Sequence, residues 1–119
     1  MKVLRVKKGG LLKELEEKIE ASLNLINKYD RYKTYLELSN KEYHMLYRNT
    51  YDSDWIKNCL SGYVQSRNTN IDLISLRQSL IDKICHNNDL MDWYKKSLAK
   101  QLEINTFLQK IYFFINFNL

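Results

Sequence analysis

Two histidines and two cysteines are the residues of this chain best suited to acid–base or nucleophilic chemistry. They are His44, His86, Cys59 and Cys85. A nucleophile needs a base within hydrogen-bond reach, and that base must itself be held in orientation. Cys85 and His86 are adjacent, so their side chains would point to different sides of a helix, and neither cysteine lies in a known motif. We therefore expect no catalytic residue, no enzyme activity and two buried thiols.

One pair of carboxylates has a spacing that could serve a metal ion. Asp89 and Asp92 are three residues apart and would share one face of a helix, a pairing that could hold Mg²⁺. Metal sites in helical bundles usually add a Glu-x-x-His motif from facing helices, but no Glu stands three residues before either histidine. Acids at the positive N-terminal end of a helix are the simpler interpretation. The sequence predicts no metal and no cofactor.

Aromatic residues suggest contact with another macromolecule. Tyrosine is enriched at protein interfaces because its rigid ring covers apolar surface while its hydroxyl still finds a partner. The sequence also ends on a concentrated apolar run, Ile111–Leu119. The candidate protein-contact residues are Tyr35, Tyr43, Tyr47, Tyr51, Phe113, Phe114 and Phe117. Several of these tyrosines also continue an apolar helical stripe, so a place in the core is the alternative for them.

The positive charge of the chain is gathered at its N-terminal end. The net charge is +5, and residues 1–13 carry five cations and no acid, while the remaining basic and acidic residues balance. A nucleic-acid-binding protein that uses this arm is therefore the alternative function, since cations release counterions from phosphates. The residues that would bind nucleic acid are Lys2, Arg5, Lys7, Lys8 and Lys13.

Helical periodicity dominates the rest of the sequence. Apolar residues at spacings of three and four predict long helices over about 11–48 and 71–114. Between them, Asp52 and Asp54 offer N-cap chemistry for a short central helix, and a polar loop follows at 66–70. We expect an all-α fold with a basic arm at 1–10 and a single helical domain at 11–119.

Two positions decide how these helices pack. Ser39-Asn40-Lys41-Glu42 matches a capping box, and Asp89 could cap a new helix after Asn88. Breaks near Asn40 and Asn88 would fold the chain into an antiparallel bundle of three to five helices, which we favour. Without the breaks, two long helices would form a hairpin whose exposed apolar seam needs a second copy.

The last residues leave a further choice of structure. Apolar residues alternate with mixed ones over 111–119, which would suit a short terminal strand. The simpler alternative is a helix that ends near Phe114, followed by a docked tail. The apolar run is too short to span a membrane and is broken by Asn116 and Asn118, so we expect no membrane span. Peripheral membrane association through the tail is a third hypothesis.

These features together favour a binding protein. The basic start of the chain lacks the apolar stretch of a secretion signal, so we expect an intracellular, cytoplasmic protein. The abundance of Asn, Lys, Ile and Tyr is typical of A+T-rich genomes, including those of phages and mobile elements. The leading hypothesis is a small helical protein that binds another protein stoichiometrically, as an inhibitor, adaptor or assembly subunit, and that also pairs with itself as a dimer.

Overall fold

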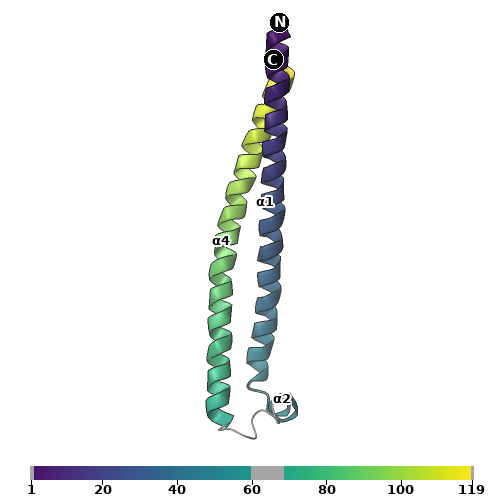
Figure 1. Cartoon of the computed structure of the whole chain (residues 1–119). Coiled ribbons are helices and arrows are strands. Elements are labelled where there is room, and N and C mark those ends of the chain that lie inside the picture. The colour runs from purple at the N-terminus through teal and green to yellow at the C-terminus, as the bar shows by residue number, and fades with distance from the viewer. Residues whose placement is uncertain (1, 60–68, 119) are drawn as a thin grey trace. The chain divides into compact units, whose positions relative to one another are not determined.

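Three helices make up the described part of the chain, and no strand occurs in that part (Figure 1). The computed structural model describes residues 2–59 and 69–118, and it describes only the backbone of residues 2–7, 59 and 69–72. Helix α1 runs Lys2–Asn49, α2 runs Ser53–Cys59 and α4 runs Thr69–Asn118. The prediction of an all-α fold with two long helical stretches and a short helix between them is confirmed.

The helices reach further towards both ends of the sequence than expected. Helix α1 begins at Lys2, so residues 2–10 of the predicted arm are helical. Helix α4 continues to Asn118, so the strand predicted over 111–119 and the helix end predicted near Phe114 are both wrong, while Leu119 lies outside the described residues. An alternation of apolar residues this short is ambiguous, because a helix that is apolar on several faces shows it too.

Neither long helix breaks where the sequence favoured a turn. Helix α1 passes through Asn40 and α4 passes through Asn88, so both predicted breaks are wrong. The Asn40 side chain is only 6% exposed, donates to Oδ1 of Asn88 over 2.9 Å and accepts from Nδ2 of Asn87 over 3.0 Å. The amide that suggested a helix cap is instead buried against amides of the other helix.

The chain forms two compact units. The terminal unit comprises Met1–Tyr32 with Trp93–Leu119, and the central unit comprises Lys33–Asp92. In the terminal unit the two helices are joined by hydrogen bonds from Ser22 to Gln101 (3.2 Å), from Asn105 to the carbonyl of Ile19 (3.3 Å) and from Tyr112 to Glu16 (2.8 Å). As the residue number in α1 falls from Ser22 to Ile19 to Glu16, the number of its partner in α4 rises from Gln101 to Asn105 to Tyr112. These segments of the two helices are therefore antiparallel.

A seven-residue pattern places the side chains between the helices of the terminal unit. Most of the buried and half-buried residues recur at alternating spacings of three and four, as in a coiled coil, while Leu25, Ser97 and Ile111 are half-buried beside this pattern. We call the residues of this pattern the terminal seam: Leu12, Leu15, Ile19, Ser22, Ile26 and Tyr29 of α1, with Tyr94, Leu98, Gln101, Asn105, Leu108, Tyr112 and Ile115 of α4.

The central unit follows the same pattern. Its seam consists of Lys33, Leu36, Asn40, Tyr43, Tyr47 and Thr50 of α1, with Leu73, Arg77, Leu80, Ile84, Asn87 and Met91 of α4. Arg77 binds the residue that follows the end of α1. Its Nη2 donates to the carbonyl of Thr50 over 2.7 Å, and its Nε donates to the Thr50 hydroxyl over 3.0 Å. The predicted cap of the short helix is confirmed: Asp52 Oδ1 accepts from the backbone amides of Asp54 and Trp55.

The seams bury little apolar surface. Among the described side chains, the buried apolar residues are Leu36, Leu73 and Leu80, and the buried polar residues are Ser22, Asn40, Thr50 and Asn105. Two packed helices leave most of each helix surface to solvent, so many large apolar side chains stay outside. These exposed apolar side chains form the surface that is available for contact with other molecules.

Candidate functional site

The end of α4 presents a cluster of exposed phenylalanines. Phe113, Phe114 and Phe117 are 63%, 59% and 68% exposed, and the rings of Phe113 and Phe117 contact each other with centroids 4.4 Å apart. Their side chains are therefore not packed into the terminal seam, although the helix that carries them is. The sequence predicted all three as contact residues, and the structure leaves them available for contact.

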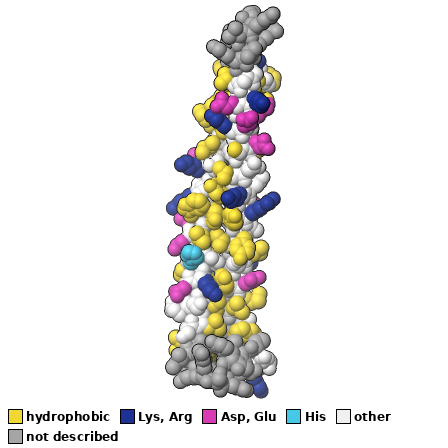
Figure 2. Space-filling model, in the orientation of Figure 1, with side chains coloured by type: hydrophobic (Ala, Val, Ile, Leu, Met, Phe, Trp, Pro, Cys, Tyr) yellow, Lys and Arg dark blue, Asp and Glu magenta, His cyan; other side chains and the backbone are white. Residues whose placement is uncertain are grey.

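On α4, a row of apolar residues lies beside the terminal seam. Each residue of this row directly precedes a seam residue in the sequence. Ile104 and Ile111 are seven residues apart, and so are Phe107 and Phe114, which places all four on one side of the helix. Trp93 lies fourteen residues before Phe107, twice that spacing, and continues the row. We call these five residues the outer row. Figure 2 shows hydrophobic side chains, in yellow, that reach the surface among the charged ones.

The outer row contains contact candidates that sequence reasoning missed. Phe107 is 63% exposed and Trp93 is also exposed, yet only Phe114 of this row was predicted. The signal was present in the sequence as the spacing of seven residues between Phe107 and Phe114. This spacing alone could not identify Phe107 as exposed, because its exposure depends on which side of α4 is covered by α1.

Trp93 also belongs to a cluster of rings at one end of the terminal unit. Its ring meets Tyr29 edge-on at 5.8 Å and Tyr94 at 5.0 Å, while Tyr32 stacks on Tyr94 at 5.5 Å. Edge-to-face and offset stacking are the favoured arrangements of aromatic pairs. The cluster holds Trp93 in place while leaving part of its indole ring open to solvent.

The four candidate tyrosines have different environments in the central unit. Tyr35 and Tyr51 are exposed, whereas Tyr43 and Tyr47 are half-buried in the central seam. The hydroxyls of Tyr47 and Tyr51 are 3.2 Å apart, and this hydrogen bond raises the pKa of Tyr47 above its ordinary value. The guanidinium of Arg77 lies 3.8 Å from the ring centroid of Tyr51. Tyr35 and Tyr51 are thus the tyrosines best placed to meet a partner.

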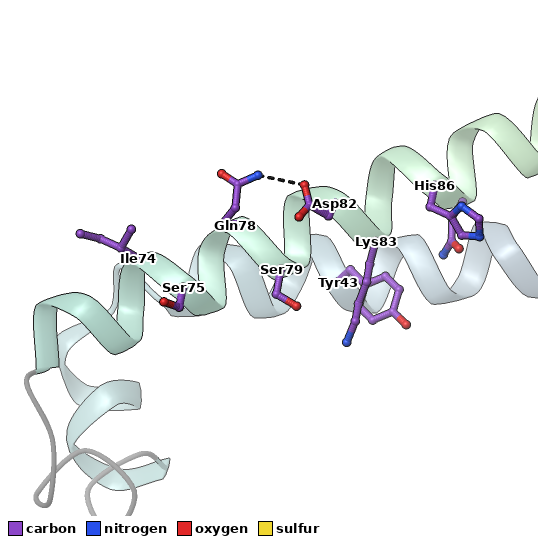
Figure 3. Close-up of a pocket in the computed structure, with 9 residues that line it drawn as sticks. Tyr43, Ile74, Ser75, Gln78, Ser79, Asp82, Lys83 and His86 are labelled. Carbon is purple, nitrogen blue, oxygen red and sulfur yellow. Dashed lines mark hydrogen bonds between the residues drawn. The ribbon is translucent and has the colours of Figure 1, made fainter.

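An open groove lies beside Tyr43 in the central unit (Figure 3). Lys83 Nζ lies over the Tyr43 ring at 5.6 Å, and Gln78 donates to Asp82 over 2.9 Å. His86 also lines the groove. The lining mixes the Ile74 side chain with hydroxyl, amide and charged groups on an open surface, which does not enclose a small ligand.

The residues first considered for chemistry lie on the surface. Cys85 is an exposed free thiol, so the prediction that it is buried is wrong, and the side chain of Cys59 lies outside those described. His44 is exposed on α1, and Asp89 is exposed on α4. Within the described residues, no group of three or more His, Cys, Asp or Glu side chains could hold a metal ion.

The basic residues of the N-terminal end are only partly described. Lys8 Nζ donates to the carbonyl of Asn116 over 3.1 Å, and Lys13 is exposed. The side chains of Lys2, Arg5 and Lys7 lie outside those described, so nucleic-acid binding through them stays a prediction. Over the part of the chain that the structure describes, neither long helix contains a stretch apolar enough to cross a membrane.

Comparison with family models, with curated proteins and with solved structures finds no match to this chain. Its function has to be argued from its own residues.

Proposed function

We propose that this chain is a helical protein–protein interaction module that acts by stoichiometric binding rather than by catalysis. One observation carries the proposal: α4 exposes Phe107, Phe113, Phe114 and Phe117, each by more than half of its side chain. Exposed clusters of large apolar side chains mark interaction surfaces, because leaving them in water costs free energy that binding recovers.

The small core supports the same proposal. A helix that is apolar on more than one side is normally covered on more than one side. Residues 102–117 of α4 pack against α1 through the terminal seam, yet they carry Leu102, Phe107 and Phe113 exposed around the helix. We propose that helices of a bound protein cover the sides of α4 that α1 leaves exposed.

The test is recovery of a complex of fixed stoichiometry. The tagged full-length chain is purified from its native host, and its complexes are weighed by native mass spectrometry. We expect one partner at a constant ratio to the wild-type chain. Replacing the four phenylalanines of α4 by serine should remove that partner, because it removes most of the apolar surface whose burial drives association.

A matched variant separates specific binding from general stickiness. Leu38 and Met45 are exposed apolar residues of α1 in the central unit, and replacing both by serine should leave the complex intact. A wild-type chain that is monomeric and carries no protein at a constant ratio would disprove the proposed function. Equal loss of the partner in both variants would also count against it.

A further inference from the structure

We propose that the partner of the outer row is a second copy of this chain, paired antiparallel through Ile104, Phe107, Ile111 and Phe114 with Trp93 at the far end. This inference deepens the proposed function and rests on it. It names one occupant for the apolar row that the terminal seam leaves open on α4.

The amount of exposed apolar surface suits an isologous dimer. An aromatic side chain presents roughly 150–250 Å², and Trp93, Phe107 and Phe114 are 54%, 63% and 59% exposed. These three rings alone therefore leave on the order of 300 Å² uncovered, and Ile104 and Ile111 add to it. A stable interface buries about 800 Å² on each partner. The row with its neighbours is of the right order for a modest dimer.

The outer row is also complementary to a second, antiparallel copy of itself. If a two-fold axis passes beside Ile104, Phe114 lies ten residues away on one side and Trp93 lies eleven residues away on the other. At 1.5 Å per residue these distances are about 15 Å and about 16.5 Å. Phe114 of one copy would therefore meet Trp93 of the second copy, and each such contact would occur twice.

The centre of the row gains a second reciprocal contact in this arrangement. Lys100 lies four residues before Ile104 and Phe107 lies three residues after it, on the same side of α4. Reversal about Ile104 brings the Lys100 ammonium of one copy over the Phe107 ring of the other. A cation over an aromatic face is attracted by the ring quadrupole.

Charge favours the antiparallel pairing over the parallel one. Residues 14–20 of α1 hold four acids, Glu14, Glu16, Glu17 and Glu20, and one lysine, Lys18, which pairs with Glu14 over 3.5 Å. The hydrogen bonds that Tyr112 donates to Glu16 and Asn105 donates to the carbonyl of Ile19 place this acidic segment level with residues 105–112 of α4.

The opposite charge lies at the other end of the same unit. Lys100 of α4 is exposed beside Gln101, and Lys95 of α4 and Lys28 of α1 are exposed near the level of the contact between Tyr29 and Trp93. An antiparallel second copy sets its lysines against the acidic segment, whereas a parallel copy would set acids against acids. Complementary charge of this kind fixes orientation and excludes the wrong one.

Sedimentation velocity of the full-length chain over a range of concentrations tests the proposal. We expect wild type to be a dimer and Phe107→Ser to dissociate about 100-fold more readily, because each dimer loses two rings that are worth roughly a factor of ten apiece. Phe117→Ser is the matched control, since Phe117 is equally exposed on α4 but lies outside the outer row. It should remain a dimer. Circular dichroism should show unchanged helix in both variants.

A cross-link gives a second test that does not rely on loss of binding. With Cys59 and Cys85 replaced by serine, Ile104→Cys should form a disulfide-linked dimer on mild oxidation, because residues at the two-fold axis lie within disulfide reach. Phe117→Cys in the same background should not.

The other occupants are outcomes of the same experiments. A monomeric wild type, a Phe107→Ser dimer that is as tight as the wild-type dimer, or cross-linking through Phe117→Cys alone would overturn the antiparallel pairing. A monomer that binds a different protein stoichiometrically would overturn it and leave the proposed function standing. A monomer that floats with vesicles of anionic lipid and binds no protein would overturn both.

Discussion

Buried polar side chains are the distinctive residues of this chain. Asn40, Ser22 and Asn105 lie inside the seams, and each has a hydrogen-bond partner on the other long helix. A satisfied buried hydrogen bond adds little net stability, but a buried group left unpaired costs much more. Such residues penalise any other alignment of the two helices, as a buried Asn does in coiled coils. They fix the register of each seam.

If Asn40 fixes the register of the central seam, Asn40→Ala should lower the free energy of unfolding. This change leaves a donor of Asn87 and an acceptor of Asn88 without partners in a part-buried site, so we expect unfolding to become easier by about 1–3 kcal/mol. Urea unfolding followed by circular dichroism measures the loss. Asn27→Ala, at an exposed position of α1, should change stability by less than about 0.5 kcal/mol. Equal effects of the two changes would show that the amide pair carries no register information.

Tyr112 predicts a specific dependence on alkaline pH. Its hydroxyl donates to Glu16 over 2.8 Å, and this hydrogen bond to the neutral form, beside a negative carboxylate, raises the pKa of Tyr112 above its ordinary value of 10.0. The unfolded chain then loses the Tyr112 proton more readily than the folded chain does. The contribution of this tyrosine to stability is therefore complete below pH 10 and is lost as the pH rises through its folded pKa.

The measurement is the thermal midpoint of wild type and Tyr112→Phe on both sides of that pH. Wild type should be the more stable at about pH 8, and its advantage should shrink at about pH 11. Tyr35→Phe, which removes a hydroxyl from an exposed ring, serves as the control and should follow wild type at both pH values. A constant difference between wild type and Tyr112→Phe would show that the bond to Glu16 does not form in solution.

At the scale of the helices, sequence periodicity was sufficient to find α1, α2 and α4 but not to find their ends. Ser39 to Glu42 has the chemistry of a capping box because an Asn or Ser side chain can accept from a free backbone amide. The same Asn40 side chain can instead pair with the side chains of Asn87 and Asn88, which lie far along the chain. Local sequence cannot distinguish these two partners.

The seams were hidden for a related reason. Lys33 and Arg77 occupy seam positions, where a search for apolar repeats expects Leu or Ile. Arg77 fits because it bonds to the end of α1 at Thr50. Phe113, Phe114 and Phe117 were predicted from their concentration at the end of the sequence, whereas the exposure of Phe107 could be seen only after α1 was placed.

The difference between seam and surface predicts a contrast between two leucines of α4. Leu80 is 3% exposed in the central seam, and Leu102 is 50% exposed in the terminal unit. Leu80→Ala removes buried methyl groups and leaves a cavity, so it should cost about 2–5 kcal/mol. Leu102→Ala should cost under about 1 kcal/mol. Chemical unfolding of both variants measures the contrast, and similar losses would mean that Leu102 is covered in solution.

For the whole molecule, folding and association should be linked. The described part of the chain buries three large apolar side chains in its seams while many more stay exposed. Burial of apolar surface is the main source of folding stability. We therefore expect part of the stability of this chain to come from apolar surface that is buried only when the chain associates. A second copy that binds only the folded chain would supply that burial and would stabilise the fold by mass action.

This linkage predicts that the thermal midpoint depends on protein concentration. If two folded copies pair through the outer row, a tenfold rise in concentration favours the dimer by about 1.4 kcal/mol, so the midpoint of wild type should rise with concentration. Phe107→Ser, which lacks the central ring of the row, should have a lower midpoint than wild type at each concentration, because its dimer is expected to dissociate about 100-fold more readily, and Phe117→Ser should behave as wild type. Circular dichroism melts over a hundredfold range of concentration distinguish the cases. A wild-type midpoint that does not move would mean that one chain is stable without covering its outer row, and the exposed rings of α4 would then have to be assigned to a different partner.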